Sequence, residues 1–267
     1  MSSVQQCSLD SLDSLLSEYY ASIDTIRKSL PLNPSRTRII TLMGAHRCDE
    51  YIKNQLENKY NNEKIFDGYW RDLHKAFEDR ITDRLTIELS KRQREVFVSA
   101  ETPEEIGRFD ILLITNGYGP ITLHDCPTNK SIAIELKTGY SWSIEQLERY
   151  LWKVGSLILA RLVTADAVVF NRTKLMSFLI DSLEDRIARA KRLLEGDVKT
   201  VPNSDCYECR IQDCQFNRSK TGNMNNLVLI KSEQFQRTPQ LMNNIYPTVD
   251  KTIELVLMEL DNVTQTE

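Results

Sequence analysis

Hydrophobic residues recur every three or four positions in several segments of the chain. In the first 30 residues this pattern runs from Leu9 to Ile23 and ends before Pro31 and Pro34. Such spacing is typical of an amphipathic helix, which a proline brings to an end. The same periodicity predicts further helices at 49–60, 68–91, 143–162, 174–194 and 246–260.

Between the third and the fourth of these helices the pattern changes to that of strands. Short apolar or alternating runs are separated there by turn signals such as 116–120 (NGYGP), and such runs predict strands. The strands expected there are 95–100, 109–115 and 131–137, and two more are expected later in the chain, a buried-looking 167–170 and 226–231. The order helix, three-strand meander, helix, strand, helix predicts an α/β fold, a mixed sheet covered by helices on both faces.

The length of 267 residues suits either one large domain or a domain with an appendage. We expect an N-terminal helical region at 1–45, a core at 46–200, and a C-terminal region at 201–267 with a cysteine cluster, a closing strand and a helix. No apolar run approaches the roughly 18 residues of a membrane span, and the N-terminus lacks the pattern of a secretory signal. The protein is therefore expected to be intracellular and cytoplasmic, without a membrane partner.

Charge and composition narrow the function classes. The chain is 41% hydrophobic, and 34 basic against 38 acidic residues give a net charge of −4. This balance argues against a surface that binds nucleic acid all over, but it allows a local basic groove. Only nine glycines are present, and none forms a phosphate-binding loop, which argues against a nucleotide-driven motor or a nicotinamide dehydrogenase.

An acidic pair and a lysine lie in the predicted meander. Glu135 and Lys137 are two residues apart in one strand, so they share a face, while Asp110 lies near the start of an earlier strand. Charged groups are seldom buried unpaired. A divalent cation between Asp110 and Glu135 would offset that cost, with Lys137 directed at the same site to hold or deprotonate a metal-bound water. The alternative is an ordinary ion pair on a solvated sheet face.

These residues belong to a longer ordered set. A segment with a histidine (68–74, GYWRDLH) precedes Asp110, and Glu-x-Lys is followed by Gln-x3-Tyr on the next helix. This set resembles the PD-(D/E)XK nuclease superfamily, specifically its RecB-like branch. The resemblance covers about 68–150 and implies a restriction-endonuclease-like core within 46–200. It further implies Mg²⁺ or Mn²⁺ held by protein ligands, a lysine that assists the nucleophile, and two helix residues that orient the lysine and contact a phosphate. The implied residues are His74, Asp110, Glu135 and the carbonyl of Leu136 as ligands, with Lys137, Gln146 and Tyr150 beside them.

Three of the six cysteines lie close together, at Cys206, Cys209 and Cys214. In a reducing compartment such a cluster binds metal more often than it forms disulfides. A trio of thiolates suits either Zn²⁺ or a [4Fe–4S] cluster, and the spacing alone does not separate the two.

The resemblance adds a fourth cysteine. A subset of RecB-like nucleases, including exonuclease V and the CRISPR-associated spacer-acquisition nucleases, holds an iron–sulfur cluster with one early and three late cysteines. By this resemblance Cys48 joins the trio and staples a helical appendage to the C-terminal region. Cys7 and Cys126 are expected to be bystanders.

We therefore expect a metal-dependent DNA nuclease that acts on single strands or DNA ends. Basic side chains near the site and on the helix at 186–192 are candidates for phosphate contacts, although that helix could equally be a solvated surface. The alternatives are a non-catalytic, metal-stapled DNA-binding or adaptor protein, and a zinc-binding structural module. Exonuclease and endonuclease action, one or two catalytic ions and the oligomeric state stay open, and any unwinding has to come from a partner such as a helicase. The candidate phosphate contacts are Arg108, Lys153, Arg186 and Arg189.

Overall fold

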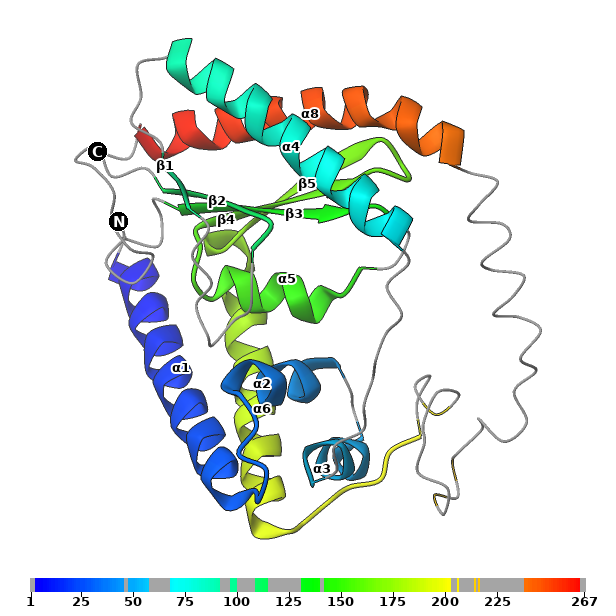
Figure 1. The fold of residues 1–267 in the computed structure, drawn as a ribbon. Coiled ribbons are helices and arrows are strands. Elements are labelled where there is room, and N and C mark those ends of the chain that lie inside the picture. Colours follow the sequence, from blue (N-terminus) through cyan, green and yellow to red (C-terminus); the bar gives the residue numbers. More distant parts are fainter. Residues whose placement is uncertain are drawn as a thin grey trace. The chain divides into compact units, whose positions relative to one another are not determined.

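The computed structural model describes residues 3–45, 48–57, 68–91, 97–99, 109–114, 131–139, 142–202, 206, 214, 216 and 238–264. The chain forms two compact units, drawn in Figure 1. Unit 1 comprises 1–63 with 176–233, and unit 2 comprises 64–175 with 234–267. None of the described helices combines the length and the apolar character needed to cross a membrane.

Unit 2 is built on a mixed sheet, as the strand pattern predicts. Among the described residues, five strands pair in the order β1-β2-β3-β4-β5. The β3–β4 pair is parallel and the other three pairs are antiparallel. A parallel pair requires a crossover connection, which here contains helix α5 (Ile144–Leu151). The strands are β1 (Phe97–Ser99), β2 (Ile111–Ile114), β3 (Ser131–Lys137), β4 (Ser156–Arg161) and β5 (Asp166–Asn171).

Helices cover both faces of this sheet. Helices α4 (Gly68–Lys91) and α8 (Thr238–Thr264) lie along one face and α5 lies against the other (Figure 1). The apolar stripe of α4 packs, as the periodicity predicts, on the side chains of β2, β3 and β4 that point to its face, and α8 completes this core. The core includes Leu73, Phe77, Ile81, Leu85, Ile111, Leu113, Ile132, Ile134, Leu136, Ile158, Ile245 and Val249.

The predicted helix at 143–162 is wrong in its second half. Helix α5 ends at Leu151, and β4 follows as a strand whose residues are nearly all buried. A short apolar run reads equally well as a buried helix or as a buried strand. Pairing on both sides decides for the strand, because β4 lies between β3 and β5. The 167–170 segment is a strand, but β5 is half-exposed rather than buried.

Unit 1 is helical. It contains α1 (Ser3–Ser29), α2 (Arg36–Ala45), α3 (Asp49–Glu57) and α6 (Met176–Glu195), and α6 packs against the other three. The helices expected in the first 30 residues and at 174–194 are confirmed, whereas α2 has no counterpart among the predicted helices. Because α6 packs with α1 and α8 packs with α4, the two units alternate along the chain. Their limits differ from the three consecutive ranges expected from the sequence.

Helix α6 ends at a glycine. Gly196 has φ +76°, and the N–H of Asp197 donates to the carbonyl of Arg192 at 3.0 Å. A left-handed residue just after the last helical turn, with a backbone bond back to that turn, is a common helix C-cap. The chain is thereby turned away from the axis of α6.

Replacing this glycine tests the cap. A Cβ at Gly196 would meet no atom within 4 Å, so only the left-handed backbone opposes alanine. We expect Gly196→Ala to lower the free energy of unfolding by about 1 kcal/mol, the cost of that conformation for an L-residue. Denaturant unfolding followed by circular dichroism measures this. Gly139→Ala is the control, because its site is equally open and has no positive φ; equal losses in the two variants would contradict the cap.

Candidate active site

Strand pairing brings the acidic pair together. Asp110 directly precedes β2, and Ile111 of β2 lies opposite Ile134 of β3. As a result, Asp110 reaches the end of β3, where its Oδ2 accepts a hydrogen bond from the N–H of Leu136 at 2.7 Å. Glu135 and Lys137 share the face of β3 away from the α4 side, as their spacing predicts.

Helix α5 supplies a hydrogen-bonded partner for the lysine. The Lys137 ammonium donates to Glu135 Oε1 at 2.5 Å and to Gln146 Oε1 at 3.0 Å. The Gln146 amide in turn donates to Glu135 Oε1 at 2.8 Å and to the Tyr150 hydroxyl at 3.0 Å. Gln146 and Tyr150 are one helical turn apart and therefore project from the same face of α5. The four side chains form one continuous network.

Local packing holds α5 in place for these contacts. Ser143 is its N-cap, with the hydroxyl oxygen accepting from the N–H of Gln146 at 3.3 Å, which satisfies a backbone donor of the first turn. Leu147 is buried on the inner face of the helix. The ring of Tyr150 packs on that of Phe109, with centroids 4.6 Å apart. Phe109 adjoins Asp110, so this ring contact also ties α5 to the acidic pair.

The predicted histidine lies beside Asp110. His74 is on α4, and its Nε2 is 3.2 Å from Asp110 Oδ1. This hydrogen bond is the main cause that raises the pKa of His74; burial opposes it, and the charges of Asp110, Glu78 and Glu135 add to it. The structure thus brings His74, Asp110 and the Glu135–Lys137 pair to one end of the sheet from separate elements.

Glu135 is the electrostatic centre of this group. Its side chain is buried at 3% exposure. Burial first, and then the charge of Asp110, raise its pKa to about 7 against the opposing effects of Lys137 and His74. Its second oxygen, Oε2, is buried without a hydrogen-bond partner among the described residues. A buried oxygen of this kind is found at catalytic sites and at places where a water or an ion binds.

The two carboxylates are donors that suit Mg²⁺ or Mn²⁺, whereas an imidazole ligand suits a transition-metal ion better than Mg²⁺. The open Oε2 of Glu135 and its neighbour Asp110 therefore fit such an ion in their chemistry. Three metal-binding side chains in a ready-made arrangement are not found among the described residues. The expected fourth ligand, the Leu136 carbonyl, belongs to the residue whose N–H bonds Asp110.

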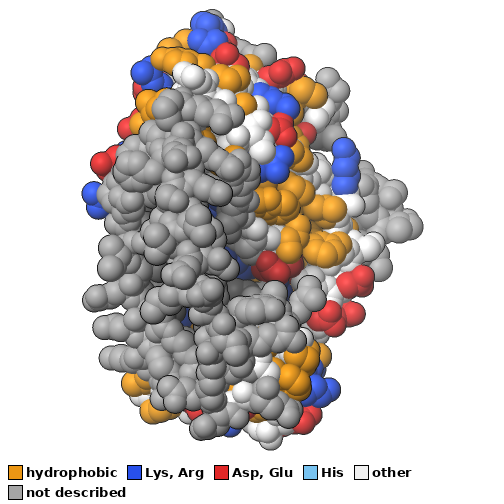
Figure 2. Space-filling view, turned by 90° about the vertical axis from the view of Figure 1, so that its right-hand side faces the viewer, with side chains coloured by type: hydrophobic (Ala, Val, Ile, Leu, Met, Phe, Trp, Pro, Cys, Tyr) orange, Lys and Arg blue, Asp and Glu red, His pale blue; other side chains and the backbone are white. Residues whose placement is uncertain are grey.

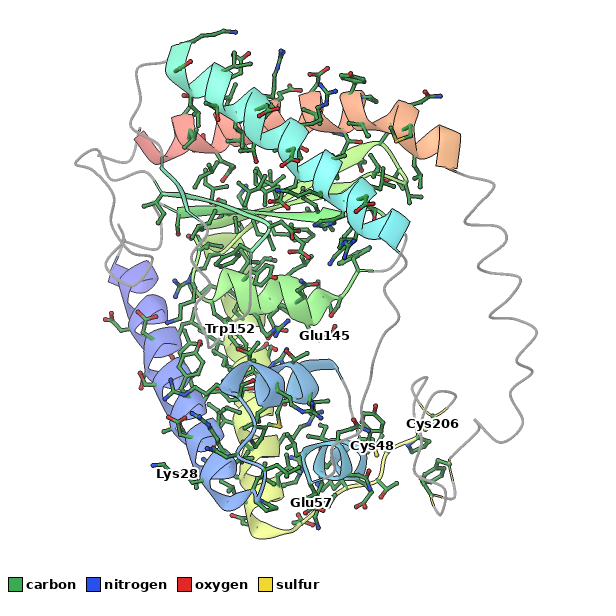
Figure 3. The ribbon with its side chains drawn as sticks, in the orientation of Figure 1. Lys28, Cys48, Glu57, Glu145, Trp152 and Cys206 are labelled. Atoms are coloured by element: carbon green, nitrogen blue, oxygen red, sulfur yellow. The ribbon has the colours of Figure 1, made fainter. Side chains whose placement is uncertain are left out.

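The cysteines of the predicted second centre lie in unit 1. Cys48, Cys206 and Cys214 carry thiols; Cys206 is buried and the other two are half-buried, while Cys209 lies outside the described residues. Cys48 immediately precedes α3, and the next N–H, that of Asp49, donates to the carbonyl of Lys199 at 3.1 Å. The start of α3 therefore adjoins the segment that leads to Cys206, as Figure 3 shows with both cysteines labelled.

The arginines expected to contact phosphate are placed inside unit 1. Arg186 is 5% exposed, and Arg189 lies 3.2 Å from Asp49 and donates to the carbonyl of Met43 at 2.5 Å. This placement favours a structural role for both arginines, because a phosphate contact would require Arg186 to become exposed and Arg189 to leave these partners. Lys153, just after α5, is half-buried, and Arg108 lies outside the described residues. Nothing in the local sequence pattern around Asp49 could have identified it as the partner of α6.

Exposed hydrophobic side chains occur on both units, and Figure 2 shows them gathered among charged ones on the described part of one face. Trp142 and Ile144, at 38% and 42% exposure, flank the N-cap of α5. They precede Gln146, the hydrogen-bond partner of Lys137, by four and two residues in the chain.

Comparisons with known proteins give no family or relative from which a function could be assigned to this chain. No protein-family model matches the chain, and no curated protein or solved structure matches it either.

The raised pKa of Glu135 predicts a pH-dependent response to cations. The folded chain holds a proton on this carboxyl up to about pH 7, while the unfolded chain releases it near the ordinary value of 4.5. Because the folded state binds more protons between these values, this group lowers stability as the pH rises through them. A cation replaces the proton, so Mn²⁺ should raise Tm more at about pH 8 than at about pH 6. Thermal denaturation with and without MnCl₂ measures the difference.

Two variants separate this effect from general cation binding. Glu135→Gln removes the titrating group and should abolish the extra rise in Tm at the higher pH. Glu254→Gln removes an exposed carboxyl of α8 and should leave it unchanged. A Mn²⁺ response in Glu135→Gln equal to that of the unsubstituted chain would exclude the site.

Proposed function

We propose that unit 2 is a divalent-metal-dependent nuclease that hydrolyses phosphodiester bonds in DNA. The observation that carries the proposal is the Glu135 carboxylate, which is buried beside Asp110, bonded to Lys137 and left with one oxygen open. A buried acid with a strongly raised pKa and a specific charge partner marks a functional site more often than a structural one. Its place at the end of β3, together with the ordered motif set, favours the nuclease.

Some of these residues would bind a cation, and others would hold or transfer a proton. Asp110 and Glu135, with His74, provide the donors for Mg²⁺ or Mn²⁺. Such an ion supplies charge stabilisation at a phosphoryl oxygen and lowers the pKa of a bound water. Lys137 presents its ammonium at the same point and assists the attacking water. Gln146 keeps Lys137 beside Glu135 through hydrogen bonds to both.

The proposed substrate is DNA with accessible single strands or ends. Trp142 supports this preference, since it is an exposed aromatic side chain next to the N-cap of α5. Aromatic side chains stack on unpaired bases without regard to sequence. A duplex would have to open to make such a contact.

In unit 1 we propose a cysteine-bound [4Fe–4S] cluster, with Zn²⁺ as the alternative. Cys48, Cys206, Cys209 and Cys214 would hold it, and its role would be structural. The hydrogen bond from Asp49 to Lys199 supports this, because it places the chain after Cys48 against the chain before Cys206. A metal held between two such segments contributes directly to the stability of the folded state.

A cleavage assay with DNA labelled at the 5′ or the 3′ end, single- and double-stranded, tests the nuclease. With Mg²⁺ or Mn²⁺ present, we expect Lys137→Ala to lower the cleavage rate at least about 100-fold, because the proton-transfer group is lost. Asp110→Ala should abolish metal-dependent cleavage. The label that is released first reports polarity and strand preference in the same experiment.

Lys174→Ala is the matched control, since it removes an exposed lysine of the same unit and should cleave at the normal rate. Circular dichroism establishes that each variant is folded. Undiminished cleavage by Lys137→Ala would exclude the mechanism. DNA binding by the unsubstituted chain without cleavage under any of these conditions would favour the non-catalytic adaptor.

The metal in unit 1 is identified from colour and metal content. We expect an anaerobically purified sample to be brown, with iron and sulfide bound, and Cys48→Ser to lose most of both. Cys7→Ser is the control and should keep them, because Cys7 is not among the proposed ligands. A colourless protein that contains zinc would replace the iron–sulfur assignment, and equal metal in Cys48→Ser would remove Cys48 from the ligand set.

A further inference from the structure

An aspartate is buried at the first position of α3. Asp49 has 1% exposure, although it carries a charge and follows directly on Cys48. A buried carboxylate is costly unless opposite charges surround it. Two arginines of α6 meet this requirement: Asp49 Oδ1 lies 3.2 Å from Arg189 Nε, and Oδ2 lies 3.0 Å from Arg192 Nε.

Asp49 also joins a third segment through its backbone. Its N–H donates to the carbonyl of Lys199, in the stretch that follows the Gly196 cap. That cap depends on Arg192 as well, since its carbonyl accepts from Asp197. One residue therefore ties α3 to the end of α6 and to the segment that returns from it.

Cys48 is held at the edge of this arrangement. Its carbonyl accepts the first helical hydrogen bond of α3, from the N–H of Ile52 at 3.2 Å. With Asp49 anchored on one side and Ile52 on the other, the backbone of Cys48 has little freedom. The same anchor bonds the chain ahead of Cys206, so it relates the two cysteine-bearing segments to each other.

An ion-paired acid in this position restricts the relative placement of the helices more strictly than a hydrophobic residue would. Apolar packing tolerates small shifts, whereas the hydrogen bond from Arg192 Nε to Asp49 Oδ2 and the ion pair of Oδ1 with Arg189 depend on the register of α3 on α6. Buried ion pairs contribute less to net stability than to such specificity, of which register is the best-established example. Residues behind metal ligands are known to tune metal affinity through the orientation of those ligands.

We propose that Asp49, acting through Arg189, Arg192 and the Lys199 carbonyl, is a positioning residue that aligns Cys48 with the segment carrying Cys206 for metal binding. The inference rests on the cysteine-bound centre proposed above and is independent of DNA cleavage. The chemical class of its ligand is a thiophilic metal ion or an iron–sulfur cluster, which the thiols would bind.

Co²⁺ is a suitable probe, because thiolate coordination gives it intense visible bands. The full reduced chain, freed of metal with a chelator, is titrated anaerobically with CoCl₂, and the dissociation constant is read from those bands. We expect Asp49→Asn to bind Co²⁺ about 10-fold more weakly, the lower end of the effect known for residues behind metal ligands. Asp49→Glu, which restores the carboxylate, should recover most of the affinity, and this rescue distinguishes positioning from a loss of fold.

Glu50→Gln is the matched control. It removes the neighbouring carboxyl in the first turn of α3, which is half-buried, and should leave Co²⁺ binding unchanged. If circular dichroism shows Asp49→Asn to be unfolded, Arg192→Gln replaces it as the test variant. Lys191→Gln, which changes the exposed neighbouring residue, is then the control. We expect weaker Co²⁺ binding in Arg192→Gln and unchanged binding in Lys191→Gln.

The outcomes separate the two proposals. Full-affinity Co²⁺ binding by folded Asp49→Asn, or by Arg192→Gln, overturns the role of Asp49 and leaves the cysteine-bound centre standing. An unsubstituted chain that shows no thiolate bands with Co²⁺, and contains no iron or zinc as purified, overturns the centre and this inference with it. An affinity loss confined to the Asp49 and Arg192 variants, restored in Asp49→Glu, supports both.

Discussion

The burial of the Glu135 carboxylate in a central strand sets the arrangement of one whole end of unit 2. β3 is a central strand that pairs with β2 on one side and with β4 on the other, and its Glu135 is only 3% exposed. Each neighbouring element supplies a polar or charged group close to this carboxylate. Lys137 follows it in the strand, α5 delivers Gln146, and His74 on α4 approaches through Asp110. The charge of Asp110 works in the opposite direction and raises the pKa of Glu135. A second acid beside a buried one makes ionisation of the buried acid still less favourable. Such an arrangement is easier to explain as a binding site than as a stabilising contact.

Unit 1 contains a buried acid of the other kind. Two guanidinium groups face Asp49: its Oδ2 accepts a hydrogen bond from Arg192 Nε at 3.0 Å, and its Oδ1 lies 3.2 Å from Arg189 Nε as an ion pair. Beside Glu135, by contrast, the Lys137 ammonium bonds one carboxylate oxygen and the charge of Asp110 opposes ionisation. A matched acid of the first type fixes the register of the elements that meet at it, while an unmatched acid of the second type is a place where a ligand can bind. A buried carboxylate therefore fixes the packing of helices in unit 1, whereas in unit 2 it belongs to a candidate reaction centre.

Much of the framework follows from local pattern. The limits of α4 and β3 agree with the predicted segments 68–91 and 131–137, because strong periodicity and clear flanking signals leave few alternatives. The failure at 143–162 has a physical cause. The apolar run of β4 carries no period of its own, and only its pairing with β3 and β5 makes it a strand. The partners of Arg189 could not be read from the sequence for a similar reason, since Asp49 and Met43 lie far away in the chain.

The amino-acid sequence alone determined which side chains share a face. Glu135 and Lys137 lie on one side of a strand and Gln146 and Tyr150 on one side of a helix, because the periods of strand and helix impose it. Only the tertiary structure decided what these faces meet. The antiparallel register of β2 on β3 brings Asp110 to the N–H of Leu136, helix packing brings His74 to Asp110, and α6 brings Arg189 and Arg192 to Asp49. Such contacts join residues distant in the chain, and the burial that changes the pKa of Glu135 exists only once they have formed.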